Sequence, residues 1–196
     1  MTDLGPGVSA ATAREELRAL RADDPPVHGG RVLAYVYDAG VEAAVQAGRE
    51  ALAEFGELNA LDPLAFPSVA RLENSLVGWG LELMRAPDGA VGTVTSGGTE
   101  SCILAVLASR DRGATILLAE TAHPAFHKAA HLLGLRTRVL PVDPETLRLT
   151  GAAVAAPLDE EGDVALVVAS APSYAHGVVD EIEGIAAACA ARGVPC

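Results

Sequence analysis

The stretch Gly92-Thr93-Val94-Thr95-Ser96-Gly97-Gly98-Thr99-Glu100-Ser101 decides the fold predicted for this chain. Residues 91–95 alternate with a β-branched character and predict a short buried strand. The Gly-Gly pair breaks this strand, and residues 99–110 carry the apolar face of a helix. A strand, a glycine turn and a helix start in this order predict an α/β unit with an anion site at the turn.

The turn itself supplies the residues for such a site. The first N–H groups of a helix have no partner within the helix, and the helix dipole adds partial positive charge there. Gly97 and Gly98 let the backbone approach a phosphate, and the Thr99 hydroxyl can add a donor. Glu100 would repel an anion, so we expect its side chain to point away. An ordinary strand-to-helix turn with Thr99 as the N-cap remains the alternative, since glycine turns are common.

Composition limits the class of protein. The chain has 196 residues, 50% of them hydrophobic and only 4% aromatic, which is enough for one domain with a core of Ala, Val and Leu. Its formal net charge of −12 argues against nucleic acid or an anionic membrane as a partner, although a local site can still bind a phosphorylated molecule. The three cysteines lack metal-ligand spacing and predict free thiols in a reducing cytoplasm. We expect no signal peptide, no membrane span and no metal.

Strands alternate with helices along the chain, which predicts a doubly wound α/β domain with a mostly parallel sheet. Ligands of such sheets lie beyond the carboxyl ends of the strands, so the segments that follow strands should meet at one edge. The expected strands are residues 91–95, 115–119, 136–142 and 164–169, with another beginning at Val194. The expected helices are residues 9–22, 40–55, 68–85, 99–110, 124–133, 151–156 (disrupted by Pro157) and 180–192.

Four stretches together resemble the group II decarboxylase-like lyases that depend on pyridoxal 5'-phosphate (PLP), and most of all their sphingosine-1-phosphate lyase branch. They are Thr-Ser-Gly-Gly-Thr-Glu-Ser at 95–101, Asn-Ala-Leu-Asp-Pro-Leu-Ala-Phe-Pro at 59–67, His-Pro-Ala-Phe-His-Lys-Ala-Ala at 123–130 and Ser-Ala-Pro-Ser-Tyr-Ala-His-Gly at 170–177. The resemblance implies the large domain of PLP-dependent fold type I, a mostly parallel sheet with helices on both faces. It implies that this domain is incomplete here.

The resemblance also implies roles for the residues of the cofactor site. Gly97, Gly98 and Thr99 match the phosphate-binding turn. His123 matches a histidine that stacks on the PLP ring and takes part in proton transfer, so it is the candidate catalytic residue. Ser170 and Ala171 match small residues that line the ring. From the residues alone, a histidine that begins a helix or a turn is the favoured interpretation of His123, and the resemblance reverses this preference.

Other candidates carry weaker signals. Asn59, Tyr174 and His176 are candidate substrate contacts, with a turn-capping Asn59 and a solvated loop around Tyr174 and His176 as alternatives. Asp62 stands where relatives often have His, which departs from the family pattern. Lys128 matches a helix position and is rejected as the Schiff-base lysine, because the lysine of the family lies much later.

The resemblance implies a function and its limits. The family's aspartate for the ring nitrogen and its Schiff-base lysine would both follow Cys196, so we expect an N-terminal fragment that is inactive alone. Residues 1–55 would form a helical arm and residues 56–196 a partial PLP domain, with a homodimer in the full-length enzyme. The function expected is that of a PLP-dependent carbon–carbon lyase, either an aldehyde-lyase or an amino-acid carboxy-lyase, on a small amino or phosphorylated amine substrate. The alternatives are a non-catalytic phosphate-ligand-binding or dimerising remnant, and a nucleotide-binding α/β domain.

Overall fold

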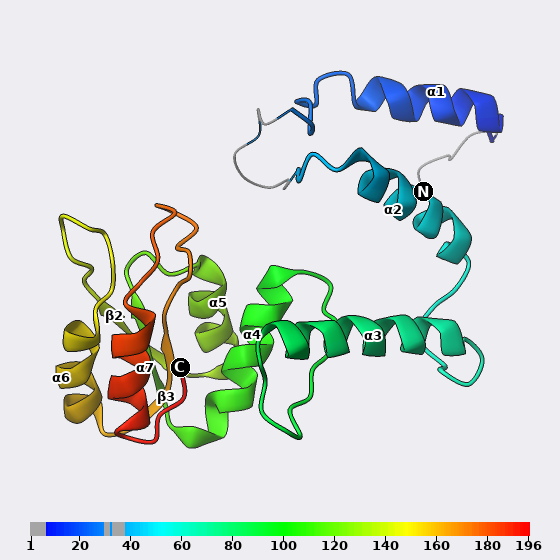
Figure 1. Cartoon of the computed structure of the whole chain (residues 1–196). Coiled ribbons are helices and arrows are strands. Elements are labelled where there is room, and N and C mark those ends of the chain that lie inside the picture. Colours follow the sequence, from blue (N-terminus) through cyan, green and yellow to red (C-terminus); the bar gives the residue numbers. More distant parts are fainter. Residues whose placement is uncertain (1–6, 30–31, 33–37) are drawn as a thin grey trace, which may run out of the picture. The chain divides into compact units, whose positions relative to one another are not determined.

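The structure, a computed structural model, describes residues 7–29, 32 and 38–196 (Figure 1). It divides into two compact units, Met1–Leu72 and Glu73–Cys196, and each is treated by itself. Residues 1–6, 30, 31 and 33–37 of the expected helical arm lie outside the described residues. Within the described part of the chain, no helix is both long enough and apolar enough to cross a membrane.

The first unit is helical. It contains α1 (Ala10–Leu20), α2 (Glu42–Phe55) and the beginning of α3 (Pro67–Leu83), which continues into the second unit. The Ser9 hydroxyl caps α1 by accepting the Thr12 N–H at 3.1 Å. All three helices agree with the sequence prediction, with ends that differ by one or two residues. Large apolar side chains of this unit stay exposed, among them Leu52 at 78% and Leu64 at 92%.

The second unit is built on a three-stranded parallel sheet in the order β2-β1-β3. The central strand is β1 (Thr115–Ala119), with β2 (Arg136–Leu140) on one side and β3 (Val164–Val168) on the other. Around it lie α4 (Gly98–Ser109), the short 3-10 helix η1 (Arg110–Arg112), α5 (Pro124–Leu133), α6 (Gly151–Glu161) and α7 (Ile182–Ala190). The predicted α/β class with a mostly parallel sheet is therefore confirmed.

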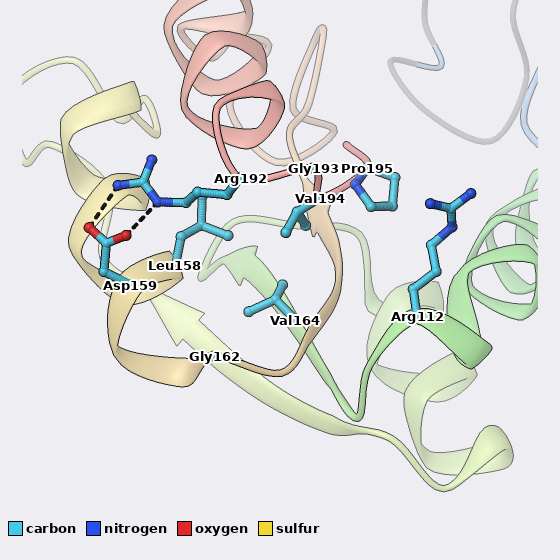
Figure 2. Close-up of a pocket in the computed structure, with 9 residues that line it drawn as sticks. All are labelled: Arg112, Leu158, Asp159, Gly162, Val164, Arg192, Gly193, Val194 and Pro195. Atoms are coloured by element: carbon cyan, nitrogen blue, oxygen red, sulfur yellow. Dashed lines mark hydrogen bonds and ion pairs between the residues drawn. The ribbon is translucent and has the colours of Figure 1, made fainter.

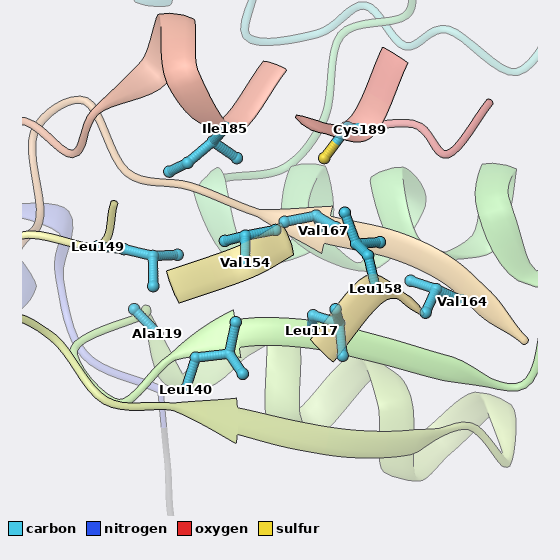
Figure 3. Packing of buried hydrophobic residues seen from close by; sticks show 10 residues of the cluster. All are labelled: Leu117, Ala119, Leu140, Leu149, Val154, Leu158, Val164, Val167, Ile185 and Cys189. Atoms are coloured by element: carbon cyan, nitrogen blue, oxygen red, sulfur yellow. The ribbon is translucent and has the colours of Figure 1, made fainter. Parts of the chain in front are cut away.

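Two hydrophobic clusters cover the two faces of this sheet. On one face Leu117 and Val167 pack with Ile185 of α7 and with buried residues of α6 (Figure 3). On the other face Ile116 and Leu118 pack with residues of α4 and α5. Successive β1 side chains point to opposite faces, so a strand between two helical layers must be apolar throughout. This arrangement explains the continuous apolar run of β1 and fixes the carboxyl ends of β1 and β3 side by side.

The predicted strand at residues 91–95 is wrong. These residues belong to no strand of the described structure, because no neighbouring strand supplies a ladder for them. Instead, the Val94 N–H and the Thr93 hydroxyl both donate to the Glu73 carboxylate at 3.1 Å. Helix α4 then begins at Gly98, one residue before the predicted start.

Two further expectations need correction. Helix α6 continues through Pro157 to Glu161, although proline removes one helical N–H. Val154 and Leu158, on either side of Pro157, are buried at 0% and 5% exposure, and their burial holds the helix together. Residues 194–196 form no strand, although the Pro195 carbonyl accepts the Val167 N–H of β3 at 3.0 Å.

Candidate functional site

Two aromatic side chains meet beyond the carboxyl ends of β1 and β3. The rings of His123 and Tyr174 lie 5.0 Å apart between centroids with an interplanar angle of 69°, an edge-to-face contact. His123 follows β1 and Tyr174 follows β3, so the contact joins loops 51 positions apart in the chain (174 − 123). Both side chains are exposed. The predicted convergence of the two segments at one sheet edge is thus present in the fold.

His123 is also the N-cap of α5. Its Nδ1 accepts the Ala125 N–H at 3.1 Å, and Pro124 occupies the first turn, where it fits without loss of a hydrogen bond. His123 therefore does begin a helix, as the interpretation from the residues alone predicted. One ring nitrogen is used in the cap, and the rest of the ring is exposed beside Tyr174.

The loop after β3 is held by Asp180, which is 1% exposed. Its carboxylate accepts the Ser170 N–H at 2.7 Å and the Leu149 N–H at 2.8 Å, and its own N–H donates to the Ser170 carbonyl at 3.0 Å. These bonds fix Ser170, and with it Ala171, directly beyond β3. Sequence reasoning placed Asp180 at the start of a helix and missed this role.

Tyr174 is carried by a tight turn within that loop. The Gly177 N–H donates to the Ser173 carbonyl and the Ser173 N–H to the Val178 carbonyl, both at 2.8 Å. Gly177 adopts φ 68°, a left-handed conformation that favours glycine. His176 lies exposed in the same turn. Tyr174 therefore lies in a turn whose two ends are joined by hydrogen bonds.

The glycine turn at the start of α4 has the features of an anion site. Gly97 is the N-cap and makes no side-chain capping bond, and a Cβ added at Gly97 or Gly98 would meet no described atom within 4 Å. Thr99, in the first turn, is exposed. The space beside the two glycines is thus open, and the first N–H groups of α4 lie at the positive end of the helix dipole.

The Glu100 carboxylate binds Ser96, the residue before the two glycines. It accepts the Ser96 N–H at 2.6 Å and the Ser96 hydroxyl at 2.7 Å. These hydrogen bonds, first from the hydroxyl and then from the backbone, hold the pKa of Glu100 below its ordinary value. The carboxylate is thus occupied by Ser96, and the expectation that it points away from a bound anion stays a prediction.

Comparison with known proteins identifies the relatives of this chain. A sphingosine-1-phosphate lyase of Saccharomyces cerevisiae is 35% identical over 165 residues, which cover 80% of this chain and 28% of the relative. A probable L-tyrosine/L-aspartate decarboxylase of Methanocella arvoryzae is 34% identical over 176 residues, which cover 87% and 44%. No protein-family model matches.

The solved structure of the sphingosine-1-phosphate lyase of Burkholderia pseudomallei matches with a TM-score of 0.86 at 27% identity, covering 99% of this chain and 48% of that one. This chain is a homologue of the sphingosine-1-phosphate lyases and group II PLP decarboxylases. It spans less than half the length of these relatives. The structural neighbours are PLP-dependent enzymes of fold type I, which supports PLP as the cofactor and confirms the predicted fold class.

The residues of this lyase homologue fit a flat phosphorylated ligand such as PLP. The open N–H groups at Gly97 and Gly98 suit a phosphate, and the exposed His123 suits a ring. The hydroxyl oxygens of Thr121 and Ser173, in the loops after β1 and β3, are buried without a hydrogen-bond partner among the described residues. Buried hydroxyls normally have partners, so these two are available to a ligand or to water.

Two further residues singled out in the sequence are Asn59 and Lys128. Asn59 belongs to the first unit, where its Oδ1 accepts the Leu61 N–H at 3.0 Å, the geometry of a turn-capping asparagine. It also lines an apolar cavity of about 460 Å³ with residues of α2. Lys128, the single lysine of the lyase homologue, is exposed on α5.

A polar cavity of about 380 Å³ lies at the opposite, amino end of β3 (Figure 2). Arg192 and Asp159 form a two-pronged ion pair on its wall, with N–O distances of 2.6 and 2.7 Å. Arg112 and Val164 also line it. Because the ligands of parallel sheets bind at the carboxyl ends of strands, this cavity is distinct from the candidate cofactor site.

Proposed function

We propose that this chain forms the phosphate- and ring-binding part of a PLP-dependent carbon–carbon lyase. The observation that carries the proposal is the exposed His123–Tyr174 pair beyond the carboxyl ends of β1 and β3, in a homologue of PLP-dependent enzymes. The bound cofactor would act as an electron sink that stabilises the negative charge left on a substrate carbon when its bond breaks. The chain's own residues bind and orient the cofactor.

Each candidate has a defined task in this proposal. The backbone N–H groups at Gly97, Gly98 and Thr99 hold the phosphate, with the helix dipole of α4 adding favourable charge. His123 lies against the ring as the catalytic residue. Ser170 and Ala171, fixed by Asp180, leave room for the ring.

Substrate contacts are proposed for three residues. Tyr174 and His176 lie on the exposed turn beyond β3. Asn59 contributes from the loop before α3, in addition to capping its own turn. These contacts would orient an amine substrate relative to the cofactor.

Lys128 is not proposed as the Schiff-base lysine. It is exposed on α5, five residues after the N-cap His123, and no lysine other than Lys128 occurs in the sequence. We propose that the Schiff-base lysine and the acid for the ring nitrogen come from residues outside these 196. The isolated chain is then inactive, and the whole enzyme is a cytoplasmic homodimer.

The substrate class is a small amine. The Ser170-Ala171-Pro172 sequence favours an aldehyde-lyase on a phosphorylated amino alcohol over an amino-acid carboxy-lyase. An assay of a protein that contains this chain and the missing lysine separates the two. Fatty aldehyde and ethanolamine phosphate from sphingosine-1-phosphate would support the first, and CO₂ from amino acids the second. PLP binding without either reaction would favour a non-catalytic ligand-binding domain.

Borohydride reduction tests the assignment on the chain itself. The chain is incubated with PLP, reduced, digested and analysed by mass spectrometry. We expect no stoichiometric cofactor adduct at Lys128. A stoichiometric adduct there in the folded chain, lost on unfolding in urea, would show that Lys128 is the cofactor lysine and would overturn the assignment.

A further inference from the structure

Two contacts hold the His123 side chain, and together they leave its Nε2 atom available to a ligand. The first contact is the N-cap hydrogen bond, in which Nδ1 accepts the Ala125 N–H at 3.1 Å. Ala125 is only 4% exposed, and Ala129, one turn later, is fully buried against the sheet, so the donor is fixed by the core. The acceptor nitrogen of the ring is thereby assigned by the fold.

This hydrogen bond determines the tautomer of the neutral ring. A neutral imidazole carries its hydrogen on one nitrogen and accepts with the other. Since Nδ1 accepts, the hydrogen lies on Nε2. A hydrogen on Nδ1 would face the Ala125 N–H and remove the cap of α5.

The second contact is with the ring of Tyr174. This ring meets the His123 ring edge to face at 5.0 Å, from a turn closed by the Ser173 and Gly177 hydrogen bonds. Tyr174 itself is 65% exposed, so the contact covers only part of either ring. The contact opposes rotation of the imidazole out of its capping orientation.

We propose that Tyr174 is a positioning residue: with the Ala125 N–H, it holds neutral His123 as its Nε2–H tautomer, a hydrogen-bond donor toward the ligand. That the ligand is PLP rests on the proposed function, whereas the tautomer does not. His123 in this state donates through Nε2 and cannot accept a proton there. Tyr174 acts through His123 and needs no contact with the reacting atoms.

The test is a two-bond ¹H–¹⁵N spectrum of the chain with ¹⁵N-labelled histidine, at about pH 9, well above the ordinary imidazole pKa of ~6.5. His123→Asn, which keeps an N-cap acceptor, identifies the His123 signals by their loss. We expect the shifts of a protonated Nε2 and an unprotonated Nδ1. A protonated Nδ1, or the averaged shifts of two tautomers, would overturn the proposal.

Variants of Tyr174 separate positioning from folding. Tyr174→Phe keeps the ring and should keep the His123 shifts, whereas Tyr174→Ala should move both nitrogens toward the tautomer average. The controls for an intact fold are the His127 and His131 signals and, in a uniformly ¹⁵N-labelled sample, the backbone amide signals of β1. Unchanged His123 shifts in Tyr174→Ala would overturn the positioning role.

Addition of pyridoxamine 5'-phosphate, which lacks the reactive aldehyde, tests the link to the cofactor. We expect the Nε2 signal of His123 to shift in the wild type, and to shift less in Tyr174→Ala. A wild-type Nε2–H tautomer that does not respond to this probe would overturn the proposed function of the site and leave the tautomer assignment standing. The two ideas can therefore fail separately.

Discussion

Asp180 and Ser170 bind each other in both directions: the Asp180 carboxylate accepts the Ser170 N–H at 2.7 Å, and the Ser170 carbonyl accepts the Asp180 N–H at 3.0 Å. The second carboxylate oxygen accepts the Leu149 N–H at 2.8 Å. This buried side chain thus joins the end of β3 to the segment that leads into α6. It sets the path of the loop that carries Ala171 and Tyr174.

Replacement of Asp180 by Ala should therefore destabilise the fold. It leaves the Ser170 and Leu149 N–H groups buried without an acceptor, and each such group costs about 1–3 kcal/mol. We expect a loss of about 2–4 kcal/mol in the free energy of unfolding, measured by urea denaturation. Asp111→Ala is the control, because the Asp111 side chain is 92% exposed and its ion pair with Arg110 contributes little. Equal, small losses in both variants would contradict the role given to Asp180.

Glu100 should make the stability of the second unit depend on pH in a defined direction. Its hydrogen bonds with Ser96 lower its pKa in the folded state, so their contribution is present above the unfolded value of ~4.3 and is lost as the pH falls through the folded value. The wild type should be more stable than Glu100→Gln at pH ~6, and the difference should shrink toward pH ~3. Urea denaturation of both proteins across this range measures it, with Glu57→Gln in the exposed loop before α3 as the control. A difference that is independent of pH would refute the assignment.

The three cysteines should differ in reactivity. Burial, and then the neighbouring Cys196 sulfur, raise the pKa of Cys189 to about 11, and Cys189 is only 2% exposed. Burial also raises the pKa of Cys102, whereas Cys196 is exposed. At pH ~8, iodoacetamide should modify Cys196 first, Cys102 slowly and Cys189 last, as followed by mass spectrometry of digests. All three should react alike in urea. If Cys189 were modified as fast as Cys196 in the folded chain, the burial of Cys189 on α7 would be contradicted.

His123 and Cys102 should contribute very differently to catalysis. In a protein that contains this chain and turns over substrate, His123→Ala should lower kcat/KM by about 10²–10⁴-fold, because it removes the ring contact and the Nε2–H donor that would position the cofactor. Cys102→Ala changes only packing within α4 and should lower it by less than about 10-fold. Steady-state kinetics of both variants measure this. Equal, small effects would refute the place given to His123 in the site.

The sequence predicted the buried strands well and the isolated strand badly. β1 matches its predicted bounds and β3 ends one residue early, because each is a continuous apolar run that only a sheet covered on both faces can bury. Residues 91–95 have the same β-branched character but no neighbouring strand in the described structure. Local strand propensity does not reveal whether a partner strand is present. Pro157 fails as a helix stop for a related reason, because the burial of Val154 and Leu158 outweighs the lost N–H.

The site was predictable in outline only. That the segments after β1 and β3 meet at one edge follows from the parallel sheet alone. The contact between His123 and Tyr174 depends on the strand register and on the turn around Gly177, which no local pattern reveals. Asp180 was missed because an aspartate before a helix resembles an ordinary N-cap, and its partners Leu149 and Ser170 are distant in sequence.

The most direct test of the account is the affinity of the chain for pyridoxamine 5'-phosphate, measured by isothermal titration calorimetry in the wild type and in Gly98→Ala. A Cβ at Gly98 meets no described atom within 4 Å, so the variant should unfold at the same urea concentration as the wild type, or a higher one. Under the proposed function the phosphate approaches the backbone at Gly98 closely, and the same Cβ would crowd it. We predict binding that requires the phosphate, shown by its absence with pyridoxamine, and an affinity at least about 10-fold weaker in the variant, or about 1.4 kcal/mol. Equal affinity in both proteins, or no binding by a folded wild type, would contradict the claim that this turn holds the cofactor phosphate.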